Sequence, residues 1–329
     1  MDKLAYIGGS FSIYWSSVIL TLAAATAVCF FLAFYLQKTG NAIAGFTVVP
    51  VSIVLSILFA RFFHWYCRDD SYASFLAAMT DYSSGGYALM GVFLGCFLTA
   101  VITRLCKLHT SLPGMMDCMC LAGAAGISVG RLASFFNAAD RGNILENLRT
   151  LPFAWPVTNA VSGSQEYRLA TFVIQAMIAG AIFFGLVIFH LHGIGRRDRK
   201  DGETTLVFAL CYGVSQVVLD STRYDSLFFR SNGFVSIVQV LSAIALAVVI
   251  VIFSIRLVKA GGFKFWYVLL FWLPLAALIG VAGFMEYYVQ RHGSEAIFAY
   301  SVMSGCLLAV VLITLLIRTQ ALEEAEKKQ

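Results

Sequence analysis

The densest group of polar residues in this apolar chain lies at 123–143, GAAGISVGRLASFFNAADRGN. Gly126 and Gly130 have the small-residue spacing that lets two membrane helices approach closely, and Arg131 follows directly. A charged side chain in a membrane segment costs about 3 kcal/mol unless it is paired, so Arg131 is predicted to be functional. The alternative is an arginine that extends to the membrane surface. Four polar or small residues follow in the sequence, at spacings expected to keep them near Arg131: Ser134, Asn137, Asp140 and Gly142.

Two further arginines lie at the ends of apolar segments. Arg223 is in LDSTRYDS, where the alternative is a local pair with Asp220 or Asp225, and Arg61 is in RFFHWYCRDD. A guanidinium stays charged and binds phosphate through two hydrogen bonds. Arg131 and Arg223 at one level of a bilayer therefore predict a clamp for a phospholipid headgroup, without specifying a reaction.

These residues are positioned by a chain that is 60% hydrophobic and 12% charged, whereas soluble domains are about 25% charged. Because a helix needs about 20 apolar residues to cross the hydrocarbon, the chain is predicted to be an all-α integral membrane protein of about nine transmembrane helices. The segments are 12–36, 44–66, 86–106, 113–135, 168–190, 204–222, 233–256, 265–287 and 296–317.

Lysine and arginine set the predicted orientation. The loops after the odd-numbered segments hold 13 of the 23 basic residues, and such loops face the cytoplasm. The N-terminus is therefore expected outside and the C-terminus in the cytoplasm of a bacterial cytoplasmic membrane. The long loop 137–167 lies on the outer side, as a functional lid or as an amphipathic segment on the headgroups.

The eight cysteines do not predict a metal site. Most lie within apolar runs, where a thiol packs as a small hydrophobic group. Cys118 and Cys120 are too close for the usual zinc pair. The sequence shows no nucleotide, metal or haem motif, and no cofactor is expected.

Five segments resemble the prolipoprotein diacylglyceryl transferase family in order and spacing, across about residues 8–258. The segment GRLASFFNAADRG (130–142) is similar to the family signature G-R-x-x-N-F-x-N-x-E-x-x-G. The other four are SGGYALMG (84–91), LPFAWPV (151–157), YGVSQVVLDSTR (212–223) and SIVQVLS (236–242).

The resemblance implies a fold for the first seven spans and a reaction. Members move the diacylglyceryl group of phosphatidylglycerol to the thiol of a lipobox cysteine in a preprolipoprotein signal peptide, releasing glycerol phosphate. Arg131 and Arg223 would hold the phosphate, Asn137 and Gly142 would shape the pocket, and Gln239 would support it. Other residues expected to bind substrate are Ser134, Arg61 and Arg168.

The chain departs from the family pattern where acid–base chemistry is expected. Met90 replaces a histidine and Ala139 replaces the glutamate of the signature. Tyr87, about one helical turn from Met90, and Asp140, next to Ala139, are the candidates to replace the missing base. General-base assistance contributes roughly 10²–10⁴-fold to rate. In a further segment, RLATFVIQ (168–175) stands for the family's R-H-P-S-Q-x-x-E, with only Arg168 clearly retained.

The sequence predicts two domains and is compatible with three functions. Residues 1–260 form the seven-span transferase-like domain, and 261–329 add two spans and a short cytoplasmic tail, predicted to face lipid or to bind a protein partner. The favoured function is a phosphatidylglycerol-dependent transferase. The alternatives are a transferase with a different acceptor, and a non-catalytic lipid-binding or assembly protein. No nucleic-acid partner is expected.

Overall fold

A computed structural model gives the fold. It describes residues 4–8, 11–68, 72–81, 86–109, 111–137, 139–144, 153–158, 163–193, 200–229, 232–261, 263–291 and 295–328. The chain forms two compact units: the first is 1–208 with 222–238, and the second is 209–221 with 239–329. These units follow internal packing, and the domain boundary expected at residue 260 stays a prediction.

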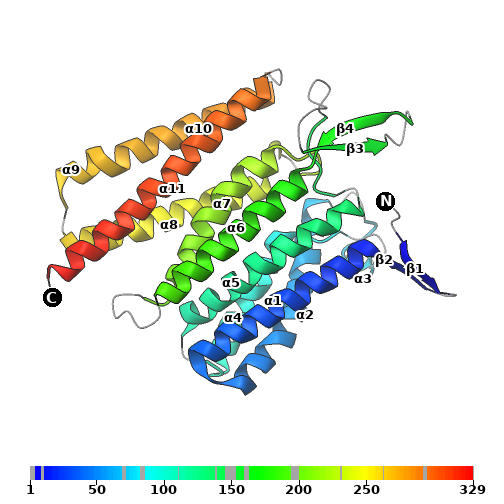
Figure 1. The fold of residues 1–329 in the computed structure, drawn as a ribbon, viewed down its shortest axis with the longest axis horizontal. Helices are drawn as coiled ribbons and strands as arrows, with labels where there is room; N and C mark the ends of the chain where they lie inside the picture. Colours follow the sequence, from blue (N-terminus) through cyan, green and yellow to red (C-terminus); the bar gives the residue numbers. More distant parts are fainter. Residues whose placement is uncertain are drawn as a thin grey trace. The chain divides into compact units, whose positions relative to one another are not determined.

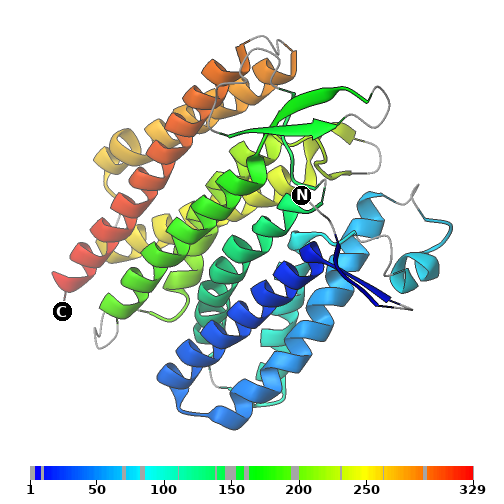
Figure 2. The same ribbon diagram turned by 45° about the vertical axis from the view of Figure 1, so that its right-hand side comes forward.

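The first unit is a bundle of long helices (Figures 1 and 2). Its helices are α1 (Trp15–Thr39), α2 (Ala42–Cys67), α3 (Phe75–Thr80), α4 (Leu89–Leu105), α5 (Leu112–Arg131) with the 3₁₀ turn η2 (Leu132–Phe135), and α6 (Thr171–His192). Helix α5 packs against both α1 and α6, and α2 packs against α4. Helix α5 therefore lies between α1 and α6, and it ends at Arg131, one of the predicted functional residues.

Local signals in the sequence set the ends of these helices. Helix α1 ends at Gly40, whose φ of 66° is left-handed, a conformation that glycine adopts without a steric penalty. Asn41 then caps α2 by accepting a hydrogen bond from Ala44 N at 3.1 Å. Ser111 caps α5 by accepting from Gly114 N at 3.1 Å.

The second unit contains the later helices. Helix α7 (Glu203–Ser221) begins in the first unit and contributes residues 209–221 to the second. The others are α8 (Ile237–Gly261), α9 (Phe265–Tyr267), the π-helical turn η3 (Val268–Trp272), α10 (Leu273–Arg291) and α11 (Ala296–Glu326). Helices α10 and α11 pack against each other, which Figure 1 shows as the orange and red pair.

Three short antiparallel hairpins were not predicted from the sequence. They pair β1 (Leu4–Gly8) with β2 (Phe11–Tyr14), β3 (Ala154–Thr158) with β4 (Gln165–Leu169), and β5 (Phe228–Phe229) with β6 (Asn232–Ser236). The β3–β4 hairpin occupies part of the loop 137–167, and Trp155 pairs with Arg168 in its register. Residues 138, 145–152 and 159–162 of that loop lie outside the described residues, and these include 151 and 152 of the segment 151–157. Residues 84 and 85 of the segment 84–91 also lie outside them.

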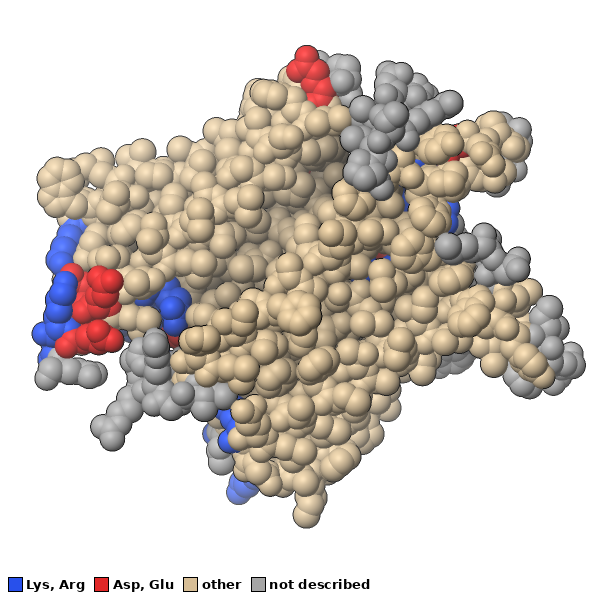
Figure 3. All heavy atoms as spheres, viewed as in Figure 1, with Lys and Arg blue, Asp and Glu red and all other residues tan. Residues whose placement is uncertain are grey.

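The nine predicted spans all correspond to helices. Within the described residues, eight helices are long and apolar enough to cross a membrane, and α4, with 17 residues, is a shorter apolar helix. Large apolar side chains such as Phe184, Leu270 and Leu308 are more than half exposed. Figure 3 shows Lys, Arg, Asp and Glu gathered at helix ends, with uncharged surface between them. The chain is a multi-pass membrane protein.

The close approach predicted at Gly126 and Gly130 is confirmed. A Cβ atom at Gly126 would lie 3.0 Å from Ala27 Cβ and 3.3 Å from Ala23 O of helix α1. A Cβ atom at Gly130 would lie 3.4 Å from Ala23 Cβ. The small residues therefore let α5 pack against α1 just before Arg131.

Candidate functional site

Three chain segments meet beyond the end of α5 in the first unit. Residues 139–144 run between the start of α6 and residues 222–225, and backbone hydrogen bonds join all three. These bonds are Phe172 N to Asp140 O at 3.1 Å, Gly142 N to Leu169 O at 2.8 Å, Asn143 N to Thr222 O at 3.1 Å and Tyr224 N to Arg141 O at 2.9 Å. The crossing brings residues distant in sequence to the end of α5.

Both predicted clamp arginines contact one carboxylate oxygen at this crossing. Arg131 Nη1 lies 2.6 Å and Arg223 Nη2 lies 2.7 Å from Asp140 Oδ1. Ser134 donates to the other oxygen of Asp140 at 3.2 Å. Arg223 also binds Asp225 Oδ1, through Nε at 3.1 Å and Nη2 at 3.0 Å. The local pair with Asp225, considered as an alternative for Arg223, is therefore present together with the longer-range pair.

The Asp140 carboxylate is held in its charged form. Its side chain is 14% exposed, and those of Arg131 and Arg223 are 12% exposed. Burial alone would raise the pKa of Asp140, but the charges of the two arginines and the hydrogen bonds from Arg131 and Ser134 outweigh it and lower the pKa from 3.8 to about 2. Asp140 is thus a counter-ion that orients two guanidinium groups.

Asn137 shapes the turn that carries Asp140. Its side-chain oxygen accepts from Ala139 N at 2.9 Å, and its backbone oxygen accepts from Arg141 Nη2 at 2.8 Å. Asp140 itself has a φ of 57°, a left-handed conformation that aspartate tolerates better than most residues. The turn therefore depends on the asparagine side chain at its start.

Gly142 lies where no side chain fits. A Cβ atom there would lie 2.6 Å from Leu169 Cβ and 2.8 Å from Thr171 Oγ1. The close contact with the start of α6 explains why glycine occupies this position of the signature.

Arg141 belongs to the same crossing and was not among the predicted site residues. Its Nε atom is buried without a hydrogen-bond partner among the described residues. Burial and the nearby positive charge of Arg168 lower the pKa of Arg141 from its ordinary value. Because Arg131 and Arg223 are balanced by Asp140 and Asp225, Arg141 is the residue that would give this cluster a positive charge. Its place in the segment 130–142, as the second arginine, after Arg131, was the sequence feature that could have indicated Arg141.

Arg168 lies on β4 and makes its contacts there. Its Nη2 atom lies 3.3 Å from Glu166 Oε2, and its guanidinium carbon lies 4.6 Å from the centre of the Tyr224 ring. The ion pair lies within β4, whereas the cation–π contact joins the hairpin to the residue that follows Arg223.

Arg61, predicted to bind substrate, instead joins α3 to a residue that precedes α4. The side chain is 2% exposed and donates to Ala78 O at 2.6 Å, to Gly86 O at 3.0 Å and to Asp81 O. The structure groups Tyr87 with Arg61, whose guanidinium carbon lies 5.4 Å from the Tyr87 ring centre. The predicted base Tyr87 and the predicted base Asp140 therefore belong to two different side-chain groups.

Gln239 lies in the second unit, at the start of α8. Its Nε2 atom donates to Val217 O and to Glu286 Oε1, each at 3.1 Å. Of the ten predicted site residues, the crossing thus brings Arg131, Ser134, Asn137, Asp140, Gly142 and Arg223 together.

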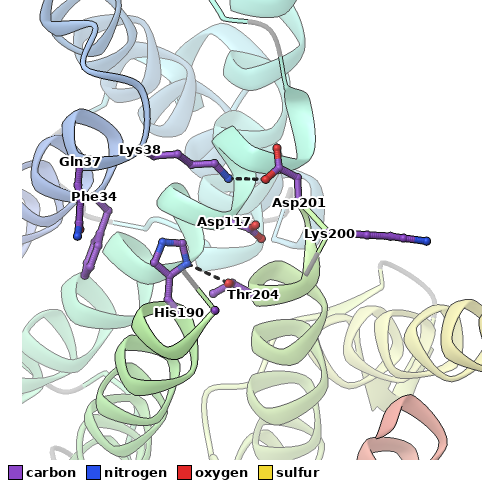
Figure 4. Close-up of a pocket in the computed structure, with 9 residues that line it drawn as sticks. Phe34, Gln37, Lys38, Asp117, His190, Lys200, Asp201 and Thr204 are labelled. Carbon is purple, nitrogen blue, oxygen red and sulfur yellow. Dashed lines mark hydrogen bonds and ion pairs between the residues drawn. The ribbon is translucent and has the colours of Figure 1, made fainter. Parts of the chain in front are cut away.

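A polar cavity of about 270 Å³ lies at the opposite end of α5. Asp117 at that end and Arg131 at the other are separated by about 21 Å along one helix. The cavity is lined by residues from α1, α5, α6, the start of α7 and the segment just before α7, including Lys38, Asp201 and His190 (Figure 4). Lys38 Nζ lies 2.7 Å from Asp201 Oδ1. These polar groups bind one another across the helix ends.

The comparisons with known proteins cover most of the chain. The family model described as prolipoprotein diacylglyceryl transferase matches residues 3–255. Proteins named phosphatidylglycerol–prolipoprotein diacylglyceryl transferase are similar to this chain. The one from Finegoldia magna is 26% identical over 255 residues, 75% of this chain and 95% of the relative. The one from Listeria innocua is 26% identical over 257 residues, 75% of this chain and 89% of the relative.

Proposed function

The chain belongs to the prolipoprotein diacylglyceryl transferase family, and on this premise we propose that it transfers the diacylglyceryl group of phosphatidylglycerol to a lipobox cysteine thiol. The names of its relatives support an enzyme of the transferase class. The observation that carries the proposal is the convergence of Arg131 and Arg223 on Asp140 Oδ1 at 2.6 and 2.7 Å.

In this proposal the arginines bind the phosphate of the donor lipid. Two guanidinium groups within reach of one oxygen atom can stabilise the negative charge that builds on a departing phosphate. Asp140 keeps both groups oriented before the lipid arrives. Arg141 supplies the additional positive charge, since its buried Nε lacks a partner among the described residues.

The proposed reaction forms one bond and breaks one. The thiol sulfur attacks the terminal carbon of the diacylglycerol, a carbon–sulfur bond forms, and the bond from that carbon to the phosphate oxygen breaks. Glycerol phosphate leaves with the electron pair, and the thiol gives up its proton. A carboxylate with a pKa of about 2 is a weak base, so Asp140 is not assigned as the base, and the departing glycerol phosphate takes up the proton.

The setting proposed for the reaction is a bacterial cytoplasmic membrane. Basic residues in the loops after the odd-numbered spans support an N-terminus outside and a C-terminus in the cytoplasm. Arg131 and Arg223 would then act at the outer surface, where a secreted precursor presents its cysteine.

A complementation experiment tests the function. The chain is expressed in a bacterium depleted of its own diacylglyceryl transferase, and mature lipoproteins are measured. Wild-type protein and Arg104→Ala, a variant at the far end of α4, should restore them, whereas Arg131→Ala should not. Rescue by Arg131→Ala would contradict the clamp.

A second candidate rests on Met90 and Ala139, which replace the family's histidine and glutamate. Met90 lies at the start of α4, and Ala139 is exposed next to Asp140. If the protein is present in the membrane and binds phosphatidylglycerol but produces no mature lipoprotein, a different acceptor or a non-catalytic lipid-binding role replaces the transferase proposal.

A further inference from the structure

Gln175 on α6 is a buried amide that has no hydrogen-bond partner within the described part of the chain. The side chain is 2% exposed, and neither its Nε2 nor its Oε1 atom has a partner among the described residues. A primary amide offers two donors and an acceptor, and leaving them unpaired in the interior is unfavourable. Such a group in a folded protein usually binds something outside the chain, either a water or a ligand.

The position of Gln175 is fixed relative to the arginine cluster. Thr171 and Gln175 are four residues apart on α6 and so share one face of the helix. Thr171 Oγ1 lies 3.2 Å from Thr222 Oγ1, next to Arg223 in the chain, and Phe172 N donates to Asp140 O at 3.1 Å. Gln175 therefore lies one helical turn, about 6 Å, further along α6 into the hydrocarbon.

A glycerophospholipid has polar groups at both depths. When its phosphate lies at Arg131 and Arg223, its glycerol esters follow toward the hydrocarbon. An ester carbonyl accepts a hydrogen bond and donates none, so it suits the free N–H of an amide. A carboxylate could not make this bond, and Gln175 stands where the similar family segment has glutamate.

We propose that Gln175 binds the glycerol-ester region of the donor lipid, with Nε2 donating to an ester carbonyl. This inference rests on the proposed function, because it takes the lipid phosphate to bind at the arginines. It adds a second contact point that selects ester-linked donors over ether-linked ones.

The test compares two donors and four proteins. Purified protein in vesicles transfers lipid to a lipobox peptide from either diester phosphatidylglycerol or its diether analogue, which lacks both carbonyls. Wild type should prefer the diester by about tenfold in kcat/KM, the size of one hydrogen bond. Gln175→Leu and Gln175→Glu should lose that preference, whereas the control Gln37→Leu, an exposed glutamine at the opposite end of the bundle, should keep it.

Each outcome decides the proposal. An unchanged diester preference in Gln175→Leu overturns it and indicates that the amide binds water only. If wild type shows no transfer, the proposed function fails, and retention of the two lipids on the detergent-purified protein, measured by native mass spectrometry, tests Gln175 by itself. Equal diester retention by wild type and Gln175→Leu then overturns the inference. Gln175→Glu serves as the second variant if the leucine variant does not fold.

Discussion

Arg131 Nη1 lies 2.6 Å from Asp140 Oδ1, and the same oxygen accepts from Arg223 at 2.7 Å. One carboxylate therefore holds together the end of α5, the turn that follows it and the segment after α7. In the proposed function, Asp140 therefore orients both arginines for the lipid phosphate. Such preorganisation reduces the reorganisation needed when negative charge develops on the phosphate.

Removing the charge of Asp140 should destabilise the first unit. Asp140→Asn leaves two nearly buried guanidinium groups without their shared counter-ion, and breaking a buried pair costs about 3–5 kcal/mol. Thermal unfolding in detergent should show the loss. The control Asp201→Asn removes a pair whose side chains are 27% and 43% exposed, which contributes about 1 kcal/mol or less. Equal effects of the two substitutions would contradict the assigned role of Asp140.

The stability supplied by Asp140 should depend on pH. Its pKa falls from 3.8 to about 2 on folding, so the folded state favours the charged form. The contribution, about 2 kcal/mol, is complete above the unfolded pKa and is lost as the pH falls from 3.8 toward 2. The difference in unfolding free energy between wild type and Asp140→Asn should therefore shrink below about pH 4. A constant difference from pH 2 to 6 is the opposite result.

The helices could be predicted from the sequence because a membrane span needs only length and apolar composition. Arg131 and Arg223 could be predicted because a charge in such a segment demands a partner. Asp140 could be predicted because it lies next to Ala139, at the position of the family's glutamate. Its role as a shared counter-ion, however, depends on the crossing of three segments. No local pattern specifies that crossing.

Arg61 and Gln175 show where sequence reasoning ended. Arg61 is an arginine near a helix end, as the clamp arginines are, yet it donates to the backbone carbonyls of Ala78, Asp81 and Gly86. Gln175 carries no charge and lies in an apolar run, so the sequence does not indicate a function for it. Its side chain is distinguished only in the structure, where it is buried without a hydrogen-bond partner among the described residues. Hydrogen-bond partners, rather than residue type, distinguish the two.

Gly142 should not tolerate alanine. The added Cβ would lie 2.6 Å from Leu169 Cβ and 3.1 Å from Leu169 O, so the crossing must shift, at a cost of about 1–3 kcal/mol. The matched control is Gly185→Ala on α6, where nothing lies within 4 Å of the new atom. That control should leave the melting temperature unchanged or raise it slightly, since alanine favours helix. A Gly142→Ala protein as stable as Gly185→Ala would refute the close contact.

Asp117 should be required for the start of α7. Its Oδ1 accepts from Thr205 N and Thr205 Oγ1, and its Oδ2 accepts from Gly202 N, each at 2.8 Å. Asp117→Ala leaves these donors unpaired and should reduce stability by about 1–3 kcal/mol. Lys200→Ala, an exposed residue of the same cavity, is the control and should have little effect on thermal unfolding. A similar loss in both variants would assign the effect to the cavity as a whole.

Glu286 on α10 should link the helices beyond the family match to the rest of the second unit. Its Oε1 accepts from Ser221 at 3.0 Å, from Gln239 at 3.1 Å and from Gln290 at 2.9 Å. Glu286→Leu removes the acceptor for all three and should lower stability by about 2–3 kcal/mol. Glu286→Gln retains an acceptor oxygen and should lose less.

A double-mutant cycle separates this link from general packing. If Glu286 acts through its hydrogen bond to Gln239, the losses in Glu286→Leu and Gln239→Leu should not add, and the coupling between them should be about 1 kcal/mol. Glu295→Gln, at an exposed carboxylate beyond the end of α10, is the control and should add independently. Full additivity of Glu286→Leu and Gln239→Leu would mean that α10 and α11 do not hold α8 through this contact.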